Sequence, residues 1–142
     1  MNRLDEYISY YNKIPKDIID KFNVLDAFTY NHSIRVCELC KLIEAELNFS
    51  DKKLSLAGLV HDIGKYYISP RILDKPDVLD DIERTIIDIH AYISYLLLKA
   101  DDVDDEVCQL ALFHHSLKPF VFANGKKSVS RKGAWFDVYP AK

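Results

Sequence analysis

An all-α fold is predicted by three observations on the sequence. Apolar residues recur at steps of three and four along several long segments, as on one face of a helix. No segment alternates polar and apolar residues in the way of a half-buried strand. The chain has 142 residues, 49% of them hydrophobic, which is enough for one buried core. We therefore expect a compact single-domain helical bundle of about five to seven helices.

The first helical pattern covers residues 4–13, and Pro15 ends it or starts the next helix, a short segment at residues 16–22. Three tyrosines of this segment either form a homodimer surface or pack in the core, and core packing is the preferred interpretation. They are Tyr7, Tyr10 and Tyr11. Residues 1–25 are thus an N-terminal helical segment. It precedes a core, residues 26–141, that contains the candidate site.

The longest helical pattern runs from about Asp26 to Leu47. One stripe of this helix carries apolar side chains at steps of four, four, three and four, and it includes a histidine. The stripe consists of Phe28, His32, Val36, Leu39 and Ile43. We therefore expect His32 to face the core.

A helix ending at His61 follows, with Ser50 as its expected N-cap. Its common face consists of Leu54, Ala57, Gly58 and His61. Pro70 and Pro76 then prevent a long helix, so residues 66–77 are predicted to form a loop with one short turn at residues 71–73.

Two further helices are predicted before the chain becomes polar and basic. The first covers residues 80–100 and aligns Ile86, His90, Ile93 and Leu97. The second carries Val107, Leu110, Ala111 and His114 on one face. Residues 116–132 are predicted to form a loop, and a short apolar piece at residues 133–139 closes the chain.

Histidines provide the main functional signal. A single histidine on an apolar face is usually a core residue satisfied by a hydrogen bond. Here four histidines lie on the buried stripes of four different helices, and a fifth follows the last of them. They are His32, His61, His90, His114 and His115. If these helices pack around one centre, the imidazoles converge, and a first-row transition metal is the usual reason for such a cluster.

The acidic neighbour of His61 extends this interpretation. Asp62 offers an oxygen ligand that can bridge two ions, and a two-metal centre can hold a bridging hydroxide as nucleophile at neutral pH. Lys65 places a positive charge near an anion held on the metals, unless it is simply a surface lysine after a helix end. Gly64 is expected to let the chain turn sharply between them. The combination indicates phosphate chemistry.

Composition excludes some classes of protein. The net charge of −3 leaves no basic footprint for duplex nucleic acid, while a small anionic substrate remains compatible with a local metal site. No window approaches the roughly 18 apolar residues of a membrane span, and the acidic N-terminus does not resemble a signal peptide. Cys37, Cys40 and Cys108 form no disulfide framework, and the first two are interpreted as buried thiols rather than zinc ligands. We expect a cytoplasmic protein with no membrane contact.

Several motifs also resemble a known family. His32-Ser33-Ile34-Arg35-Val36 and His61-Asp62-Ile63-Gly64-Lys65 are similar to the opening histidine and the doublet of the HD superfamily of metal-dependent phosphohydrolases. The HD-GYP branch is resembled more closely, over about residues 26–141. The motifs concerned are Ile72-Leu73-Asp74-Lys75-Pro76, then Leu79, Glu83, His90 and Leu97, then the His114-His115 pair, and Asp137-Val138-Tyr139 with Ala141.

The resemblance implies an HD-type helical fold with a binuclear centre of two divalent transition metal ions, Fe or Mn. It implies that Asp62 bridges the ions and that Lys65 contacts the substrate phosphate, so these two residues are the expected catalytic groups. Phe28 stands where some members carry a glutamate for a third ion, and a phenyl ring cannot replace it. The implied metal ligands are His32, His61, Asp62, His90, His114, His115 and Asp137.

The chain departs from the branch after the paired histidines. It has Ser116 to Phe120 in place of the expected glutamate, and the Gly-Tyr-Pro motif is absent from the sequence. The leading hypothesis is a phosphodiesterase acting on a nucleotide or cyclic dinucleotide. The alternative is a degenerate metal-containing module that binds a nucleotide or a protein partner without turnover.

Three basic residues complete the candidate site. Arg35 is either a substrate contact or the partner of a nearby acid. Lys126 and Lys127 belong to a basic loop that is either solvated or an anion clamp over the metals.

Overall fold

The structure is a computed structural model, and it describes residues 3–115. The chain divides into two compact units, Met1–Leu112 and Phe113–Lys142. Lys126, Lys127 and Asp137 lie outside the described residues.

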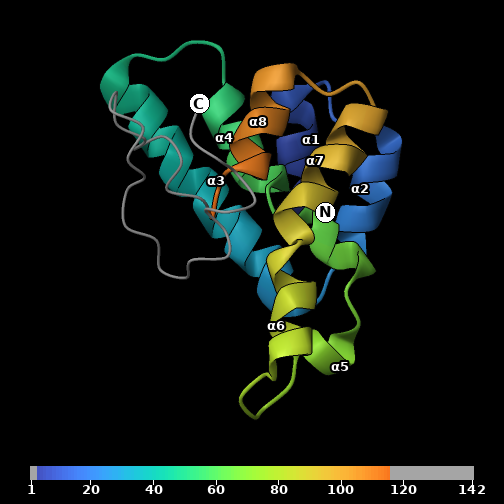
Figure 1. Cartoon of the computed structure of the whole chain (residues 1–142). Helices are drawn as coiled ribbons and strands as arrows, with labels where there is room; N and C mark the ends of the chain where they lie inside the picture. The colour runs from blue at the N-terminus through green and yellow to red at the C-terminus, as the bar shows by residue number, and fades with distance from the viewer. Residues whose placement is uncertain (1–2, 116–142) are drawn as a thin grey trace, which may run out of the picture. The chain divides into compact units, whose positions relative to one another are not determined.

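The described part of the first unit is all-helical, with no strand, which confirms the predicted fold class (Figure 1). The elements are α1 (Arg3–Tyr11), α2 (Lys16–Asn23), α3 (Ala27–Leu47), α4 (Lys53–Val60), the 3₁₀ helix η1 (Ile63–Tyr67), α5 (Pro70–Leu73), α6 (Asp81–Asp88), α7 (His90–Ala100) and α8 (Asp105–Leu112). The short turn expected within residues 66–77 is α5.

The N-terminal segment folds as predicted. Pro15 separates α1 from α2 and occupies the N-cap position of α2. Tyr7 and Tyr11 are buried in the core, whereas Tyr10 is exposed. The preferred interpretation of core packing is therefore confirmed for two of the three tyrosines.

The predicted buried stripe of α3 is wrong. Phe28 is 70% exposed and Leu39 is 57% exposed. The side chains that α3 buries are instead Thr29, Ser33, Ile34, Cys37 and Glu44. This helix carries apolar residues on more than one face, so its period alone does not identify the inner face, and packing against α4 decides it. The start was predicted correctly, because the Asp26 side chain accepts the backbone N–H of Thr29 at 3.0 Å.

The N-terminus of α4 is capped differently from the prediction. Ser50 does not cap the helix; Lys52 occupies the N-cap position with a left-handed backbone, φ 62°. The buried carboxylate of Glu44 on α3 accepts the backbone N–H of Ser55 at 2.8 Å. A side chain from a neighbouring helix thus satisfies one of the first-turn N–H groups that Ser50 was expected to satisfy.

The single helix expected over residues 80–100 is two helices, α6 and α7. Asp80 and Glu83 form a capping box at the start of α6. At the junction the N–H of Ile89 is shared between the carbonyl oxygens of Thr85 and Ile87, and the Ile87 oxygen also faces the Nδ1 atom of His90. The pairing is thus irregular at Ile89, where α6 ends, and α7 begins at His90.

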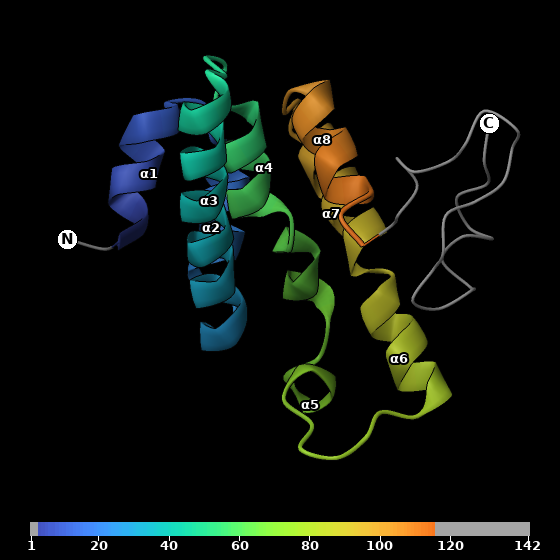
Figure 2. The ribbon, with the colours of Figure 1, turned by 90° about the vertical axis from the view of Figure 1, so that its left-hand side faces the viewer.

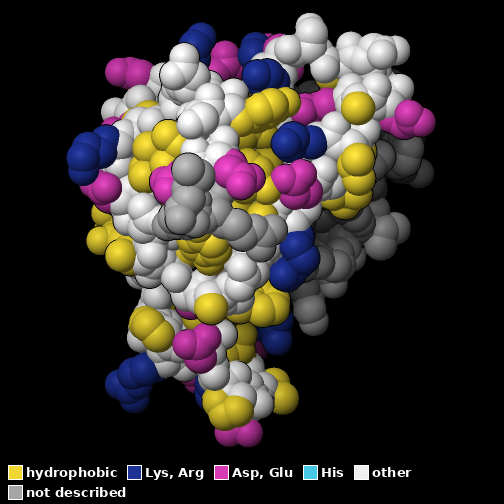
Figure 3. Space-filling model, turned by 180° about the vertical axis from the view of Figure 1, so that it is seen from behind, with side chains coloured by type: hydrophobic (Ala, Val, Ile, Leu, Met, Phe, Trp, Pro, Cys, Tyr) yellow, Lys and Arg dark blue, Asp and Glu magenta, His cyan; other side chains and the backbone are white. Residues whose placement is uncertain are grey.

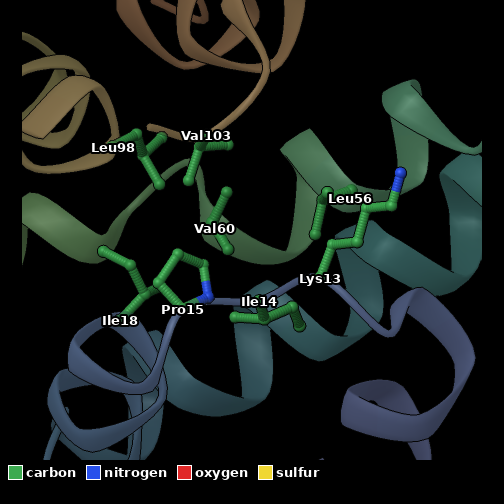
Figure 4. A pocket seen from close by; sticks show the side chains of 8 residues that line it. All are labelled: Lys13, Ile14, Pro15, Ile18, Leu56, Val60, Leu98 and Val103. Atoms are coloured by element: carbon green, nitrogen blue, oxygen red, sulfur yellow. The ribbon is translucent and has the colours of Figure 1, made fainter. Parts of the chain in front are cut away.

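The helices of the first unit pack in a defined sequence (Figures 1 and 2). Helix α3 lies along α4, α4 packs against α8, α8 against α7, and α7 against η1. A small apolar cavity between the α1–α2 linker, α4 and α7 is a packing defect without a carboxylate or an imidazole (Figure 4). It is lined by Lys13, Ile14, Pro15, Ile18, Leu56, Val60, Leu98 and Val103.

The three cysteines are free thiols. Cys37 is buried as expected, whereas Cys40 is only half-buried, and Cys108 is also buried. Burial raises the pKa of Cys37 to about 11. On the face shown in Figure 3, exposed hydrophobic side chains alternate with charges of both signs. Among the described helices, none has the length and apolar character needed to cross a bilayer.

Candidate metal centre

The centre is built on the junction between α4 and η1. His61 continues the helical backbone beyond α4, and Asp62 occupies the position before η1. Because η1 has three residues per turn, Lys65 lies above Asp62, and its Nζ is 3.2 Å from Asp62 Oδ2. The Asp62 side chain is only 2% exposed. A buried carboxylate needs positive charge or hydrogen bonds close to it, so this is a natural place for a cation.

Close packing of η1 against α7 brings a second helix to Asp62. A Cβ atom at Gly64 would lie 2.2 Å from the backbone oxygen of His90 and 2.7 Å from the nitrogen of Ser94. Gly64 is therefore required for the close approach of two backbones. The expected reason, a sharp turn needing backbone freedom, is wrong, because the backbone of Gly64 is not in the left-handed region.

Ser94 completes this contact and was missed as a functional residue. Its hydroxyl accepts the backbone N–H of Gly64 at 2.8 Å and donates to the carbonyl oxygen of His90 at 2.9 Å. The sequence held one signal, a serine four residues after His90 on the buried side of an apolar helix. Ser94 joins η1 to the first turn of α7 and so holds His90 near Asp62.

Three imidazoles from three elements surround the Asp62 carboxylate. The Nε2 atom of His90 lies 3.0 Å from Oδ1, while His61 Nε2 and His32 Nε2 lie 3.2 Å and 3.6 Å from Oδ2. The ligand atoms of His32, His61 and Asp62 lie within 4.8 Å of one another. His61 and His90 are buried, whereas the side chain of His32 is 36% exposed. His32 thus forms the solvent edge of the centre.

Hydrogen bonds orient the two buried rings. His61 Nδ1 lies 2.7 Å from the backbone oxygen of Gly58, and His90 Nδ1 contacts the backbone oxygen of Ile87. A carbonyl oxygen can only accept, so Nδ1 carries the proton in both rings. The Nε2 atom of each ring then faces the Asp62 carboxylate. A backbone carbonyl on Nδ1, with Nε2 directed at the centre, is the arrangement found for metal-binding histidines.

The third ring is also held in the form that binds metal. Burial lowers the pKa of His32. The Asp62 carboxylate opposes this shift, while the charges of His61 and Lys65 add to it. A lower pKa favours the neutral imidazole, which is the metal ligand. The nitrogen and oxygen donors of this cluster therefore fit a divalent metal ion.

The structure brings together five of the residues predicted from the sequence, and these are His32, His61, Asp62, Lys65 and His90. Arg35 is exposed on α3, and its charge acts on His32. In the second unit, the rings of His114 and His115 lie side by side with centroids 4.0 Å apart.

The family follows from the sequence match. Residues 29–129 match the HD domain, which is more than half of the chain. This chain is an HD domain protein. The match includes His32, the His61-Asp62 doublet and Lys65, so the predicted HD superfamily membership is confirmed.

Curated relatives share part of this HD domain. The chain is 40% identical over 99 residues to 3′3′-cGAMP-specific phosphodiesterase 1 of Vibrio cholerae, covering 66% of this chain and 23% of the relative. It is 36% identical over 126 residues to cyclic di-GMP phosphodiesterase PA4108 of Pseudomonas aeruginosa, covering 82% of this chain and 30% of the relative. Ribonuclease Y of Lawsonia intracellularis is 31% identical over 104 residues, covering 71% of this chain and 17% of the relative. The chain thus spans less than a third of the length of each of these relatives, and no solved structure matches it.

Proposed function

We propose that this HD domain is a metal-dependent phosphodiesterase that acts on a nucleotide or a cyclic dinucleotide. The observation that carries the proposal is the arrangement around Asp62, where three imidazole Nε2 atoms and one ammonium group surround a single buried carboxylate. Two relatives named as cyclic dinucleotide phosphodiesterases support this choice of substrate. Phosphodiesters are anions, and Lys65 is the positive charge nearest to the carboxylate.

Two divalent ions, Fe or Mn, are the proposed cofactor, since nitrogen and carboxylate donors suit these metals. When bound, such ions lower the pKa of a water molecule and offset the negative charge of the phosphate. Asp62 is the proposed bridging ligand. The remaining proposed ligands are His32, His61, His90, His114, His115 and Asp137.

The other residues have proposed roles in orienting the substrate. Lys65 binds a nonbridging phosphate oxygen and stabilises the charge that develops there during attack. His61 and His90 keep their Nδ1 protons on backbone carbonyls, which fixes the direction of both rings through the reaction. Arg35, Lys126 and Lys127 are proposed as further contacts to the anion.

We also propose the bounds of the domain, its cellular compartment and its oligomeric state. We place a single HD-type domain over residues 1–142, with the N-terminal segment at residues 1–25 and the metal-binding core at residues 26–141. The three free cysteines support a reducing compartment, and we propose the cytoplasm. A homodimer is the proposed assembly, and Tyr10 is the exposed tyrosine of α1 that it would use.

The direct test is hydrolysis by the purified chain loaded with Mn²⁺ or Fe²⁺. The substrates are cyclic di-GMP, 3′3′-cGAMP and a single-stranded RNA oligonucleotide, with metal content measured on the same sample. We expect a cyclic dinucleotide to be hydrolysed and Asp62→Ala to reduce kcat/KM at least about 100-fold. Asp105→Ala is the matched control, because that carboxylate pairs with Lys99 on the surface and should leave activity unchanged.

Two outcomes would count against turnover. A sample with bound metal that hydrolyses none of the three substrates would refute the phosphodiesterase. Binding of a cyclic dinucleotide by that inert sample would support the alternative module without turnover, which the missing Gly-Tyr-Pro motif favours.

A further inference from the structure

An exposed aromatic ring borders the metal centre. Phe28 lies in the first turn of α3 and is 70% exposed. It precedes His32 by four residues, which is about one helical turn or 6 Å along the axis. The two rings are parallel, with an interplanar angle of 5° and centroids 6.3 Å apart. Since His32 Nε2 faces Asp62, Phe28 lies on the side of α3 that leads to the centre.

The fold does not account for the exposure of Phe28. The side chains that α3 buries toward α4 start with Thr29, and Phe28 is not among them. Burying a phenyl ring would stabilise the protein, so leaving one in water forgoes that stabilisation.

Helix η1 also carries two exposed tyrosines, Tyr66 and Tyr67. Their rings pack edge to face with centroids 4.9 Å apart, and Lys21 Nζ lies over the Tyr66 ring at 5.5 Å. Phe28 is the exposed ring that is parallel to His32 of the centre.

Phosphate and ring are arranged in the order found within a nucleotide. Asp62 and Lys65 mark the place for a phosphate, His32 lies next to it, and Phe28 follows one turn away. A nucleoside has the same order of parts, with its ribose between phosphate and base. Nucleobases stack on exposed aromatic side chains with little dependence on sequence.

We infer that Phe28 is the stacking platform for a nucleobase of the substrate. The inference rests on the proposed function, because it assumes a phosphate at Asp62 and Lys65. It narrows the substrate class to phosphoesters that carry a base next to the reacting phosphate. Phe28 acts on affinity for the base and has no contact with the reacting atoms.

Equilibrium binding measurements can separate the contribution of the base to the affinity from the contribution of the phosphate. The full chain loaded with Mn²⁺ is titrated calorimetrically with GMP and with ribose 5-phosphate, which share a sugar phosphate and differ in the base. We expect wild type to bind GMP more tightly. Phe28→Ala should reduce the ratio of the two affinities by about tenfold, the effect of one lost stack. Phe28→Leu should do the same, and Phe28→Trp should restore the ratio.

Phe49 provides the matched control. It is also an exposed phenylalanine, 51%, and it follows the opposite end of α3. Phe49→Ala should leave the affinity ratio at the wild-type value. An equal ratio in wild type and in both Phe28→Ala and Phe28→Leu would overturn the inference. That result is distinct from a failure of the proposed function, which is absence of turnover and does not affect this binding measurement.

Discussion

Two buried polar clusters connect helices in this protein, and they differ in how their charges are satisfied. In the first, the hydroxyl of Tyr11 donates to Ser55 Oγ at 2.7 Å, while the Glu44 carboxylate accepts the backbone N–H of Ser55 at 2.8 Å. Each of these acceptors faces a donor. In the second, His61 and His90 contact backbone carbonyls through Nδ1 and turn Nε2 toward the Asp62 carboxylate. Three imidazoles and the Lys65 ammonium group converge there on one carboxylate.

The difference distinguishes a structural cluster from a binding site. The Tyr11 cluster is complete within the protein and holds α1, α3 and α4 together. The Asp62 cluster instead gathers nitrogen and oxygen donors around one buried carboxylate, which is the donor set of a metal site. Both clusters are buried, so burial alone would not have told them apart.

Of the substitutions that separate the two clusters, Gly64→Ala is expected to have the largest effect on stability and on Mn²⁺ binding. The new Cβ would collide with two backbone atoms of α7, which cannot move without displacing His90. We expect about 3 kcal/mol of destabilisation, at the upper end for overpacking, and loss of Mn²⁺ binding. Denaturant unfolding and metal titration measure the two effects.

Gly58→Ala is the control for that substitution. Its added Cβ would lie 3.2 Å from Cys40 Sγ and from a methyl group of Val36, which can adjust, and 3.3 Å from the Cα atom of Cys37. This backbone approach is much milder than the 2.2 Å at Gly64. It should cost less stability than Gly64→Ala and weaken Mn²⁺ binding less, although the Gly58 carbonyl contacts His61. Equal losses of metal affinity in the two variants would refute a specific role for the η1–α7 contact.

An intermediate effect is expected from Glu44→Ala, which breaks the structural cluster. The Ser55 N–H loses a buried acceptor, at a cost of about 1–3 kcal/mol. Thermal unfolding should show the loss, while the increase in Tm on adding Mn²⁺ should equal that of wild type. A smaller Mn²⁺-induced increase would mean that the two clusters are coupled.

The smallest change in stability is expected from Ser94→Ala, which acts on the metal centre. The N–H of Gly64 loses its acceptor, at about 1–2 kcal/mol. Loss of this support for His90 should weaken Mn²⁺ binding about tenfold, the lower limit for residues that orient metal ligands. Calorimetric titration with Mn²⁺ measures it.

Ser33→Ala is the matched control for Ser94→Ala. Ser33 Oγ is also buried on a helix next to a histidine, but it has no hydrogen-bond partner in the described part of the chain. Its removal should leave both stability and Mn²⁺ affinity close to wild type. If Ser33→Ala weakens metal binding as much as Ser94→Ala, the Ser94 hydrogen bonds are not the cause.

The sequence by itself determined the helical class, most helix positions and the histidines of the candidate centre. These features depend on local chemistry. Pro15 separates two helices because it lacks an N–H, and Asp26 caps α3 with its own carboxylate. The His61-Asp62-x-x-Lys65 spacing places a carboxylate and an ammonium group on one side of a single turn.

Only the tertiary structure decided which face of α3 is buried, which residue caps α4, and why position 64 is glycine. Helix α3 is apolar on several sides, so its partner selects the inner face and leaves Phe28 and Leu39 exposed. Lys52 occupies the N-cap of α4, and Glu44 from another helix accepts an N–H of its first turn. Gly64 meets a backbone 26 to 30 residues away in sequence. Contacts between distant segments leave little local pattern in a sequence, and the centre is assembled by such contacts.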